Sequence, residues 1–270
     1  MTAPTLTRQE LRGVTLLGDQ ERPCGVTLAF TERTGGVSAA PFASLNLGDA
    51  CGDEPEAVAE NRRRALGALG CADLLDRLVN PRQVHGDHVV VVGSSEPDAL
   101  AAAVGEARAG ADAVVCTCED VPVLLCYAVC VPVMFVCPGG FAVVHSGWRG
   151  TEKRIAAKAL RVLLERTGAA PTEALAYVGP HIGVADYEVS PELAARFSAS
   201  FGPEVVRPGN SLDLGRAVAL ALLEAGLGER SICDCGISTA ASTNRFYSYR
   251  AEGGHCGRHG ALAIRRGSQR

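Results

Sequence analysis

Residues 121–144 carry no charged side chain, and this run constrains the fold more than any other feature of the sequence. It is long enough to cross a bilayer as a helix. Pro122, Pro132, Pro138 and the pair Gly139-Gly140 interrupt it, however, and many of its residues are β-branched. Because such residues disfavour one continuous helix, we predict two or three buried strands joined by a tight turn, and no membrane association.

Other apolar segments complete a mixed pattern of strands and helices. Strands are expected at residues 26–31, 88–92, 112–117, 122–127, 131–136, 141–145, 175–178 and 261–265. Helices are expected from Asp53 to about Gly70, from Thr151 to Gly168, from Ser190 onward and from Asp213 to about Leu227, with a loop or short helix in residues 94–115. Since strands and helices do not alternate strictly, we predict an α+β fold. It would be one domain over residues 1–270, with a mixed or antiparallel sheet core flanked by helices and with less order in about the first 20 residues.

Composition narrows the classes of function. The net charge of −4 and the pI of about 5.9 give no basic surface, so no nucleic-acid partner is expected. Eleven cysteines are an odd number, and the N-terminus lacks the basic and apolar segments of a secretory signal. Free thiols in a reducing cytoplasm are therefore predicted. The pairs Cys116/Cys118 and Cys233/Cys235 match neither a redox C-x-x-C motif nor a zinc knuckle, so they are expected to be packing cysteines.

The stretch HSGWRGT, residues 145–151, joins a buried strand to an expected helix. The unpaired N–H groups and positive dipole end of a helix starting near Thr151 would form an anion site. Gly147 and Gly150 allow a ligand to approach the backbone, and Arg149 adds a forked donor that suits phosphate or carboxylate. The alternative is an ordinary strand-to-helix turn with a surface arginine.

Histidines and cysteines at strand ends predict a metal site. His85 lies just before one expected strand, and His145 ends another. Two imidazoles and one thiolate with an open fourth position are typical of catalytic zinc. A competing pair is His255 and His259 in HCGRH, whose i, i+4 spacing on a helix would face one metal, with a polar loop as the alternative. Spacing leaves the choice of thiol open among Cys116, Cys118, Cys126, Cys130 and Cys137.

Motifs that run nearly from end to end of the chain carry a resemblance to a known family. They are FASLNLGDACGDEPEAVAENRRRAL, RQVHG, ADAVVCT, CVPVMF, VVHSGWRGT, GPHIGVADYEVSPEL, LDLGRAVALALL and RFYSYRAEGGHCGRHGALAI. The combination of QVHG, CVPV and H-x-GWRGT in that order is very specific. The chain resembles the laccase-domain family, once labelled multicopper polyphenol oxidoreductases and now regarded as zinc-dependent purine nucleoside phosphorylases.

The resemblance implies roles for particular positions. The family's Zn²⁺ ligands fall on His85, Cys130 and His145. The residues expected to bind substrate and phosphate are Arg149, Thr151, Asn46, Arg62 and Gln83. The motifs assign no general acid.

The chain departs from the family pattern at three places. Val129 stands where an aspartate usually precedes the metal-binding cysteine, Ala185-Asp186 replaces paired cysteines, and Ser238-Thr239 replaces Cys-Thr. The missing aspartate matters most, because it would serve as a proton acceptor or orienting group beside the metal. The substitutes to be weighed are Glu119, Asp186 and His181.

The resemblance implies a purine nucleoside phosphorylase of the glycosyltransferase class. It would cleave adenosine, inosine or methylthioadenosine with phosphate to the base and ribose 1-phosphate, and would also deaminate adenosine, a branch that Val129 puts in doubt. One alternative is a cysteine amidase acting on cell-wall peptide fragments, with Cys130 as nucleophile and His85 or His145 as base. Another is a metal-binding protein with reduced activity. Copper is not expected, because multicopper sites need many imidazoles, usually in His-x-His pairs, and the six histidines form no such pair.

Overall fold

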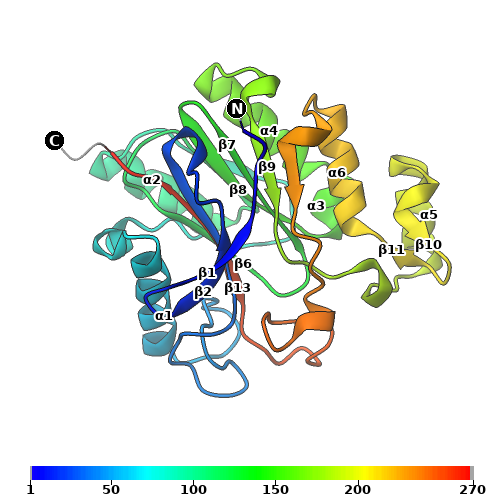
Figure 1. Ribbon diagram of the computed structural model, residues 1–270, viewed down its shortest axis with the longest axis horizontal. Coiled ribbons are helices and arrows are strands. Elements are labelled where there is room, and N and C mark those ends of the chain that lie inside the picture. Colours follow the sequence, from blue (N-terminus) through cyan, green and yellow to red (C-terminus); the bar gives the residue numbers. More distant parts are fainter. Residues whose placement is uncertain (1, 268–270) are drawn as a thin grey trace.

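Two β-sheets face each other at the centre of the molecule, which the computed structural model describes over residues 2–267 (Figure 1). The six-stranded sheet consists, in order, of β12 (Ile232–Asp234), β9 (Leu175–Val178), β7 (Val131–Cys137), β8 (Gly140–Ser146), β5 (Ala113–Cys116) and β4 (Val89–Val92). The five-stranded sheet consists of β1 (Thr7–Leu11), β2 (Val14–Gly18), β3 (Val26–Thr31), β13 (His259–Arg265) and β6 (Val123–Tyr127). A small hairpin is formed by β10 (Val206–Arg207) and β11 (Ser211–Leu212).

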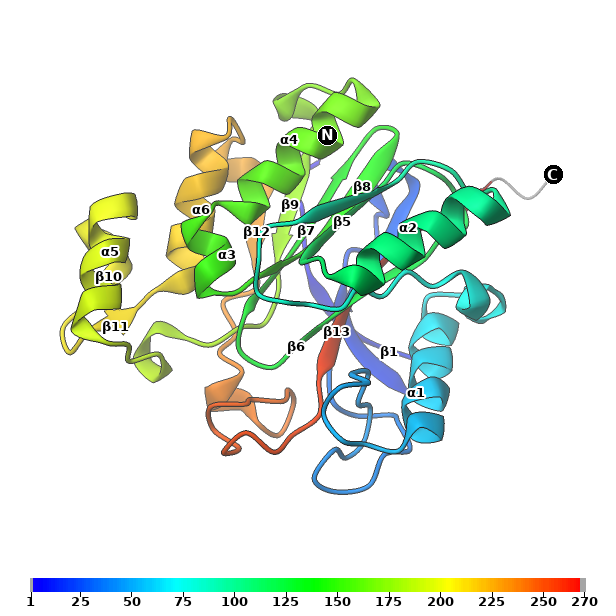
Figure 2. The ribbon, with the colours of Figure 1, turned by 180° about the vertical axis from the view of Figure 1, so that it is seen from behind.

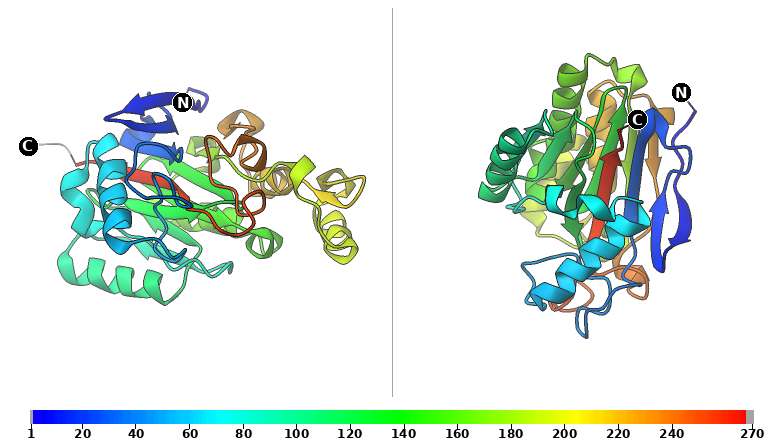
Figure 3. Two further views of the ribbon diagram at one scale, coloured as in Figure 1. Left: turned by 90° about the horizontal axis from the view of Figure 1, so that it is seen from below. Right: turned by 90° about the vertical axis from the view of Figure 1, so that its left-hand side faces the viewer.

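Helices cover the outer faces of both sheets, so the layers run helix, sheet, sheet, helix (Figures 2 and 3). On the five-stranded sheet the covering helix is α1 (Pro55–Ala68). On the six-stranded sheet the covering helices are α4 (Ile155–Thr167) and α6 (Leu214–Glu224). The remaining helices are α2 (Pro97–Ala109) along β4, the short α3 (Trp148–Glu152) after β8, and α5 (Pro191–Phe201) beside the β10–β11 hairpin.

The uncharged run of the sequence is buried as the three strands β6, β7 and β8. Along β7 successive side chains alternate between the two faces of the sheet. Val133 and Phe135 pack with the helices, whereas Met134 and Val136 pack against the five-stranded sheet. The predicted core strands are therefore confirmed. No helix within residues 2–267 combines the length and the apolar character needed to cross a membrane.

The fold is α+β in a single domain, as the sequence predicts, and all eight predicted strands are present with ends shifted by at most two residues. The expectation of less order in the first 20 residues is wrong for β1 and β2. β2 pairs with β3 and β1 pairs with β2, and Val14 and Leu16 are buried in the apolar cluster that includes Ala65 and Leu66 of α1. These pairings join β2 to a sheet whose other strands come from distant segments, and the local pattern gives no sign of it.

The helix expected from Thr151 to Gly168 is two helices, α3 and α4. Arg154 separates them, with a left-handed backbone at φ 58°. Its guanidinium pairs with Glu224 of α6 and stacks on the ring of Phe201 of α5. Thr151 therefore lies in the last turn of α3 and not at a helix N-terminus. Residues 94–115, expected to hold a loop or a short helix, contain the 13-residue helix α2.

The HCGRH segment is not a helix, so the predicted i, i+4 metal pair does not form. His255 is exposed in a turn, and His259 starts β13 with its ring fully buried between those of Tyr127 and Phe246. Neither ring nitrogen of His259 has a hydrogen-bond partner among the described residues. Burial lowers the pKa of His259 to about 3, and the backbone of Pro180, which is too poorly placed to make a full hydrogen bond, offsets this only in part.

We expect His259→Met to stabilise the fold, because it replaces an unsatisfied buried ring with an apolar side chain that adapts its shape. The gain in unfolding free energy should be about 1–3 kcal/mol at neutral pH, measured by urea unfolding. The unfolded state takes up a proton at this histidine below pH about 6.5, whereas the folded state does not. The wild type should therefore lose about 1.4 kcal/mol more than the variant between pH 7.5 and 5.5. Equal losses in the two proteins would contradict the assignment.

Candidate metal centre

The three predicted metal ligands meet at one edge of the six-stranded sheet. His85 lies in the loop before β4, Cys130 lies in the turn before β7, and His145 is near the end of β8. β4 is parallel to β5, and β8 is antiparallel to both β5 and β7. The starts of β4 and β7 and the end of β8 therefore lie at the same edge.

The three side chains form a compact cluster of donor atoms. One nitrogen of each histidine and the Cys130 sulfur all lie within 4.8 Å of one another, so the group could hold a metal ion. The His85 and His145 rings meet edge to face, with centroids 4.8 Å apart. His145 is only 4% exposed, Cys130 is partly buried and His85 is exposed. The cluster therefore has a buried side and a side open to solvent.

Asp112, the residue before β5, holds this cluster together. Its carboxylate accepts hydrogen bonds from the backbone N–H groups of Val84 (3.2 Å), His85 (3.0 Å) and Gly86 (2.7 Å). It also accepts from Nδ1 of His145 at 2.8 Å, which leaves Nε2 of that ring free to face the cluster. Burial alone would raise the pKa of Asp112, but these hydrogen bonds and the charge of His145 hold it below its usual value.

The sequence reasoning missed Asp112. It lies within the motif ADAVVCT, which the sequence predicts only as a strand. A fully buried acidic residue at the start of an otherwise apolar strand is the signal that could have identified it, because a buried carboxylate needs partners. Its main partner, His145, is 33 residues away in the chain and directly opposite in the β5–β8 pair.

The cluster has unusual electrostatics even without a metal. Burial would raise the pKa of Cys130, yet the charge of His145 and hydrogen bonds from His145 and His85 lower it to about 6. Burial would lower the pKa of His145, yet the Cys130 thiolate and Asp112 raise it to about 9. The thiolate, which is the metal-binding and nucleophilic form, is thus present at neutral pH.

Gly147, which follows β8 and precedes α3, leaves little room for a side chain. A Cβ atom there would lie 3.0 Å from the Cys130 sulfur and 3.2 Å from Cδ2 of His85. A Cβ atom on Gly150 would lie 2.9 Å from the carbonyl oxygen of Gly86. The glycines of the HSGWRGT stretch therefore let the start of α3 pack directly on the cluster and on the His85 loop.

Arg149 and Thr151, the two expected phosphate ligands, lie in different environments. Arg149 is exposed, its guanidinium stacks on the Trp148 ring at 4.5 Å, and its side chain forms no ion pair or hydrogen bond within residues 2–267. Thr151 is 2% exposed, and its hydroxyl is hydrogen-bonded to the hydroxyl of Ser146 at 2.8 Å. Arg149 is thus available to a ligand, whereas Thr151 joins α3 to β8.

Asn46 and Gln83 make hydrogen bonds that hold loops in place. Asn46 is fully buried; its amide donates to Asp53, and its oxygen accepts from the backbone N–H of Gly48 and Arg258. Gln83 both donates to the carbonyl oxygen and accepts from the N–H of Cys126, at 2.8 Å each. This double hydrogen bond ties the loop that carries His85 to β6.

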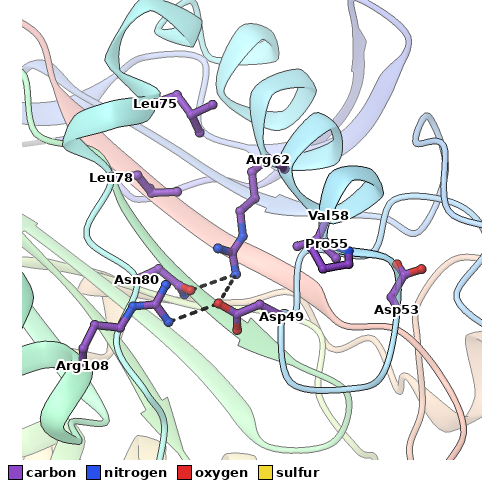
Figure 4. Close-up of a pocket in the computed structure, with 10 residues that line it drawn as sticks. Asp49, Asp53, Pro55, Val58, Arg62, Leu75, Leu78, Asn80 and Arg108 are labelled. Carbon is purple, nitrogen blue, oxygen red and sulfur yellow. Dashed lines mark hydrogen bonds and ion pairs between the residues drawn. The ribbon is translucent and has the colours of Figure 1, made fainter.

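Arg62 lines a cavity of about 320 Å³ between α1 and the end of α2 (Figure 4). Its guanidinium donates to Asn80 at 2.9 Å and pairs with Asp49 at 3.2 Å. Arg108 pairs with the same carboxylate at 3.1 Å, so Asp49 lies between two arginines. Asn80 lines this cavity, and His85 of the metal cluster follows it five residues later. Residues 80–85 therefore run from the cavity to the cluster.

Three residues are candidates to replace the missing aspartate: Glu119, Asp186 and His181. None of them places an unpaired carboxylate at the cluster. Glu119 follows the far end of β5, opposite the end that carries Asp112. Asp186 accepts a hydrogen bond from Ser238, and the ring of His181 is bonded to the Gly179 carbonyl. The backbone of Val129 accepts from Ile182, and its side chain packs against the apolar core on the helix-covered side.

The fold and the cluster define a two-sheet α+β protein with a His₂Cys group at one sheet edge. Residues 27–266 match the family described as multi-copper polyphenol oxidoreductase laccase. The chain is 34% identical to purine nucleoside phosphorylase YlmD of Geobacillus stearothermophilus over 97% of its length and 98% of that protein. It is 39% identical to the purine nucleoside phosphorylase of Deinococcus radiodurans over 87% of each chain. The crystal structure of the Geobacillus YlmD superposes with a TM-score of 0.85 at 32% identity, over 98% of this chain and 100% of that one. The chain belongs to this laccase-domain family.

We expect Asp112→Asn to weaken metal binding about 10- to 100-fold, the usual effect of losing a carboxylate that orients a histidine ligand. The variant keeps the shape of the side chain but loses its charge and one acceptor oxygen. Competition with a chelator measures the affinity. Asp87→Asn is the matched control, because Asp87 lies on the same loop but pairs with Lys153 and Lys158 instead. Equal affinity in the Asp112 variant and the control would show that Asp112 does not organise the site.

Proposed function

We propose that this protein is a zinc-dependent purine nucleoside phosphorylase. The observation that carries the proposal is the cluster of His85, Cys130 and His145 in a chain whose relatives bear that name. The substrates would be adenosine, inosine and methylthioadenosine. Phosphate would displace the purine from the anomeric carbon of the pentose: the glycosidic bond breaks, a bond to a phosphate oxygen forms, and the departing base takes up a proton.

Zinc fits the donor set. One thiolate and two imidazoles are ligands that Zn²⁺ prefers, and three protein ligands with an open position are typical of catalytic zinc. Zinc bonds of about 2.0–2.3 Å place ligand atoms within roughly 4.6 Å of each other at most, close to the 4.8 Å limit found here. Bound there, Zn²⁺ would act as a Lewis acid towards an oxygen at the exposed side of the cluster. Within residues 2–267 this is the single His/Cys/Asp/Glu group of its kind, which supports one zinc ion rather than a multicopper centre.

Arg149 would bind the phosphate. Its guanidinium is exposed, it is fixed in orientation by the Trp148 ring, and no carboxylate of the described chain neutralises it. It is two residues from Gly147, which contacts Cys130 and His85. A phosphate held by Arg149 would therefore lie near the open side of the cluster. Thr151 would contribute indirectly, by fixing α3 on β8.

Of the remaining predicted substrate residues, one is a candidate for binding the substrate and two have structural roles. Arg62 lines a cavity of about 320 Å³, which is within the usual range for small-molecule sites, so we retain it as a candidate for substrate binding. The polar atoms of Asn46 and Gln83 are already occupied by protein partners. We therefore propose that these two residues position loops rather than contact the nucleoside.

The cluster also supports one other function. Cys130, His145 and Asp112 form a thiolate–imidazole–carboxylate series like that of cysteine hydrolases, and the pKa of Cys130 near 6 suits a nucleophile. A cysteine amidase is therefore the second candidate. Metal content separates the two, because a thiolate bound to zinc is a poor free nucleophile.

The first prediction for the proposed function concerns the ligands. Purified protein should contain about one zinc ion per chain, and His85→Ala, Cys130→Ala and His145→Ala should each lower this content in elemental analysis, because two ligands hold zinc poorly. Cys126→Ala is the control: its thiol is four residues away and bonds to the Leu47 carbonyl. Full retention of zinc in all three ligand variants would refute the assignment, whereas purified protein without zinc would favour the amidase.

A second prediction concerns phosphate. Arg149→Ala should raise the phosphate concentration required for half-maximal rate by roughly 10- to 150-fold, because a charge-assisted hydrogen bond contributes about 1.5–3 kcal/mol. Arg149→Lys should recover only part of this loss, since it lacks the planar fork. Zinc content should not change. Arg196→Ala is the matched control, because Arg196 also lies over Trp148 but is paired with Glu152. If Arg149→Ala lowered only thermal stability, Arg149 would be a structural residue.

A third prediction concerns Val129. Without the family's aspartate, phosphorolysis of adenosine should exceed its deamination, and Val129→Asp should raise deamination selectively by adding a proton acceptor beside Cys130. Val129→Asn has a similar size but no such acceptor, so it should leave the product ratio unchanged. Chromatography of adenine, inosine and hypoxanthine measures the ratio. A wild type that makes mainly inosine would show that Val129 does not determine it.

A further inference from the structure

Two cysteines that the proposed function does not use lie at the far end of β5. Cys116 is the last residue of this strand, whose other end is next to Asp112, and its side chain is fully buried between the two sheets. Cys118 lies in the bend that follows and is partly exposed. Their sulfur atoms are 3.7 Å apart. The C-x-C spacing predicts packing cysteines, whereas the fold brings the two thiols into contact.

Two arginines, Arg265 and Arg77, act on this pair of thiols. Arg265, at the end of β13, donates to the carbonyl oxygen of Thr117, the residue between the two cysteines, at 3.0 Å. The Nε atom of Arg265 is buried and has no hydrogen-bond partner among the described residues. Its charge favours the thiolate form of both cysteines, and that of Arg77 favours the thiolate of Cys118. A partly buried guanidinium whose Nε–H has no partner in the described part of the chain is suited to a nearby anion.

The contact between the two sulfur atoms shifts the pKa values of the two thiols in opposite directions. The hydrogen bond from Cys116 is the largest effect on Cys118 and, with the two arginines, lowers its pKa to about 7 against the opposing effect of burial. The same contact, together with burial, raises the pKa of Cys116 well above its usual value. The proton therefore stays on the buried Cys116, and the thiolate is on the more accessible Cys118. A reactive, accessible thiolate beside a second thiol is the arrangement found in reversible thiol–disulfide sites.

We propose that Cys116 and Cys118 form a dithiol site that is reversibly oxidised to an intramolecular disulfide by small disulfides. The Cys118 thiolate attacks one sulfur of the small disulfide, a mixed disulfide forms, and one small thiolate leaves. Cys116 then attacks the Cys118 sulfur, and its proton passes to the departing small thiolate, which leaves as the second small thiol. The two cysteines are oxidised by two electrons in total, and the small disulfide is reduced to two thiols.

The pair Cys233/Cys235 provides an internal control. It has the same C-x-C spacing, but no contact between its sulfur atoms occurs in the described part of the chain. Burial raises the pKa of Cys233, and it raises that of Cys235 to about 12. Spacing alone therefore does not create the reactive site; the contact between sulfurs and the two arginines do.

The test uses the full-length, zinc-loaded protein at pH 7, in which a bound metal protects Cys130. The probe is 5,5′-dithiobis(2-nitrobenzoic acid) in limiting amount, and reacted cysteines are located by peptide mass spectrometry. We expect Cys118 to react at least about fivefold faster than Cys233 and Cys235. Its lower pKa gives it a larger fraction of thiolate, and this outweighs the lower intrinsic nucleophilicity of that thiolate. The product should be a Cys116–Cys118 peptide lacking two hydrogen atoms, with no probe attached, and dithiothreitol should restore both thiols.

Two variants separate the two steps. Cys116→Ser should leave the probe attached to Cys118, because no second thiol can displace it. Arg265→Gln replaces the charged guanidinium with a neutral polar side chain. This variant should slow the reaction of Cys118 without changing that of Cys235. A wild-type protein in which Cys118 reacts no faster than Cys235, or in which the probe stays on Cys118, would overturn the proposal. Neither result bears on the phosphorylase, because the dithiol lies at the opposite end of β5 from the metal cluster.

Discussion

The buried carboxylate of Asp112 joins a loop, two strands and a histidine ring at one point. It accepts three backbone N–H groups from the loop that carries His85 and one ring N–H from His145. A buried charge is costly unless it is fully hydrogen-bonded, and here four donors satisfy it. The same loop holds His85 at φ 58°, a conformation that non-glycine residues rarely adopt. Asp112 thus fixes both histidines relative to the strand on which it lies.

The cluster has a buried side and a side that is open to solvent. His145 and Asp112 are buried by the sheets, so the orientation of the His145 ring does not depend on solvent. His85 and Arg149 are exposed and lie on the two segments that converge at Gly147. In the proposed phosphorylase, the buried side would hold the zinc ion, and Arg149 at the exposed side would bind the attacking phosphate.

The sequence predicts the strands well because the central ones are apolar on both faces. Such strands are specified by their own residues, and β3, β7 and β9 begin where expected. The motif resemblance selects Cys130 from several thiols, which spacing could not do. Two interactions that sequence reasoning missed join distant segments: Asp112 to the His85 loop, and Arg154 to α6. Contacts of this kind depend on tertiary structure and leave little local pattern.

The most direct test of the account identifies the products made from nucleosides. The zinc-loaded protein is incubated with adenosine, inosine or methylthioadenosine, with and without phosphate, and the base and the sugar product are separated by chromatography. The account predicts that free base appears together with the pentose 1-phosphate, and only when phosphate is present. No release of base by fully zinc-loaded protein, or release at the same rate without phosphate, would contradict it.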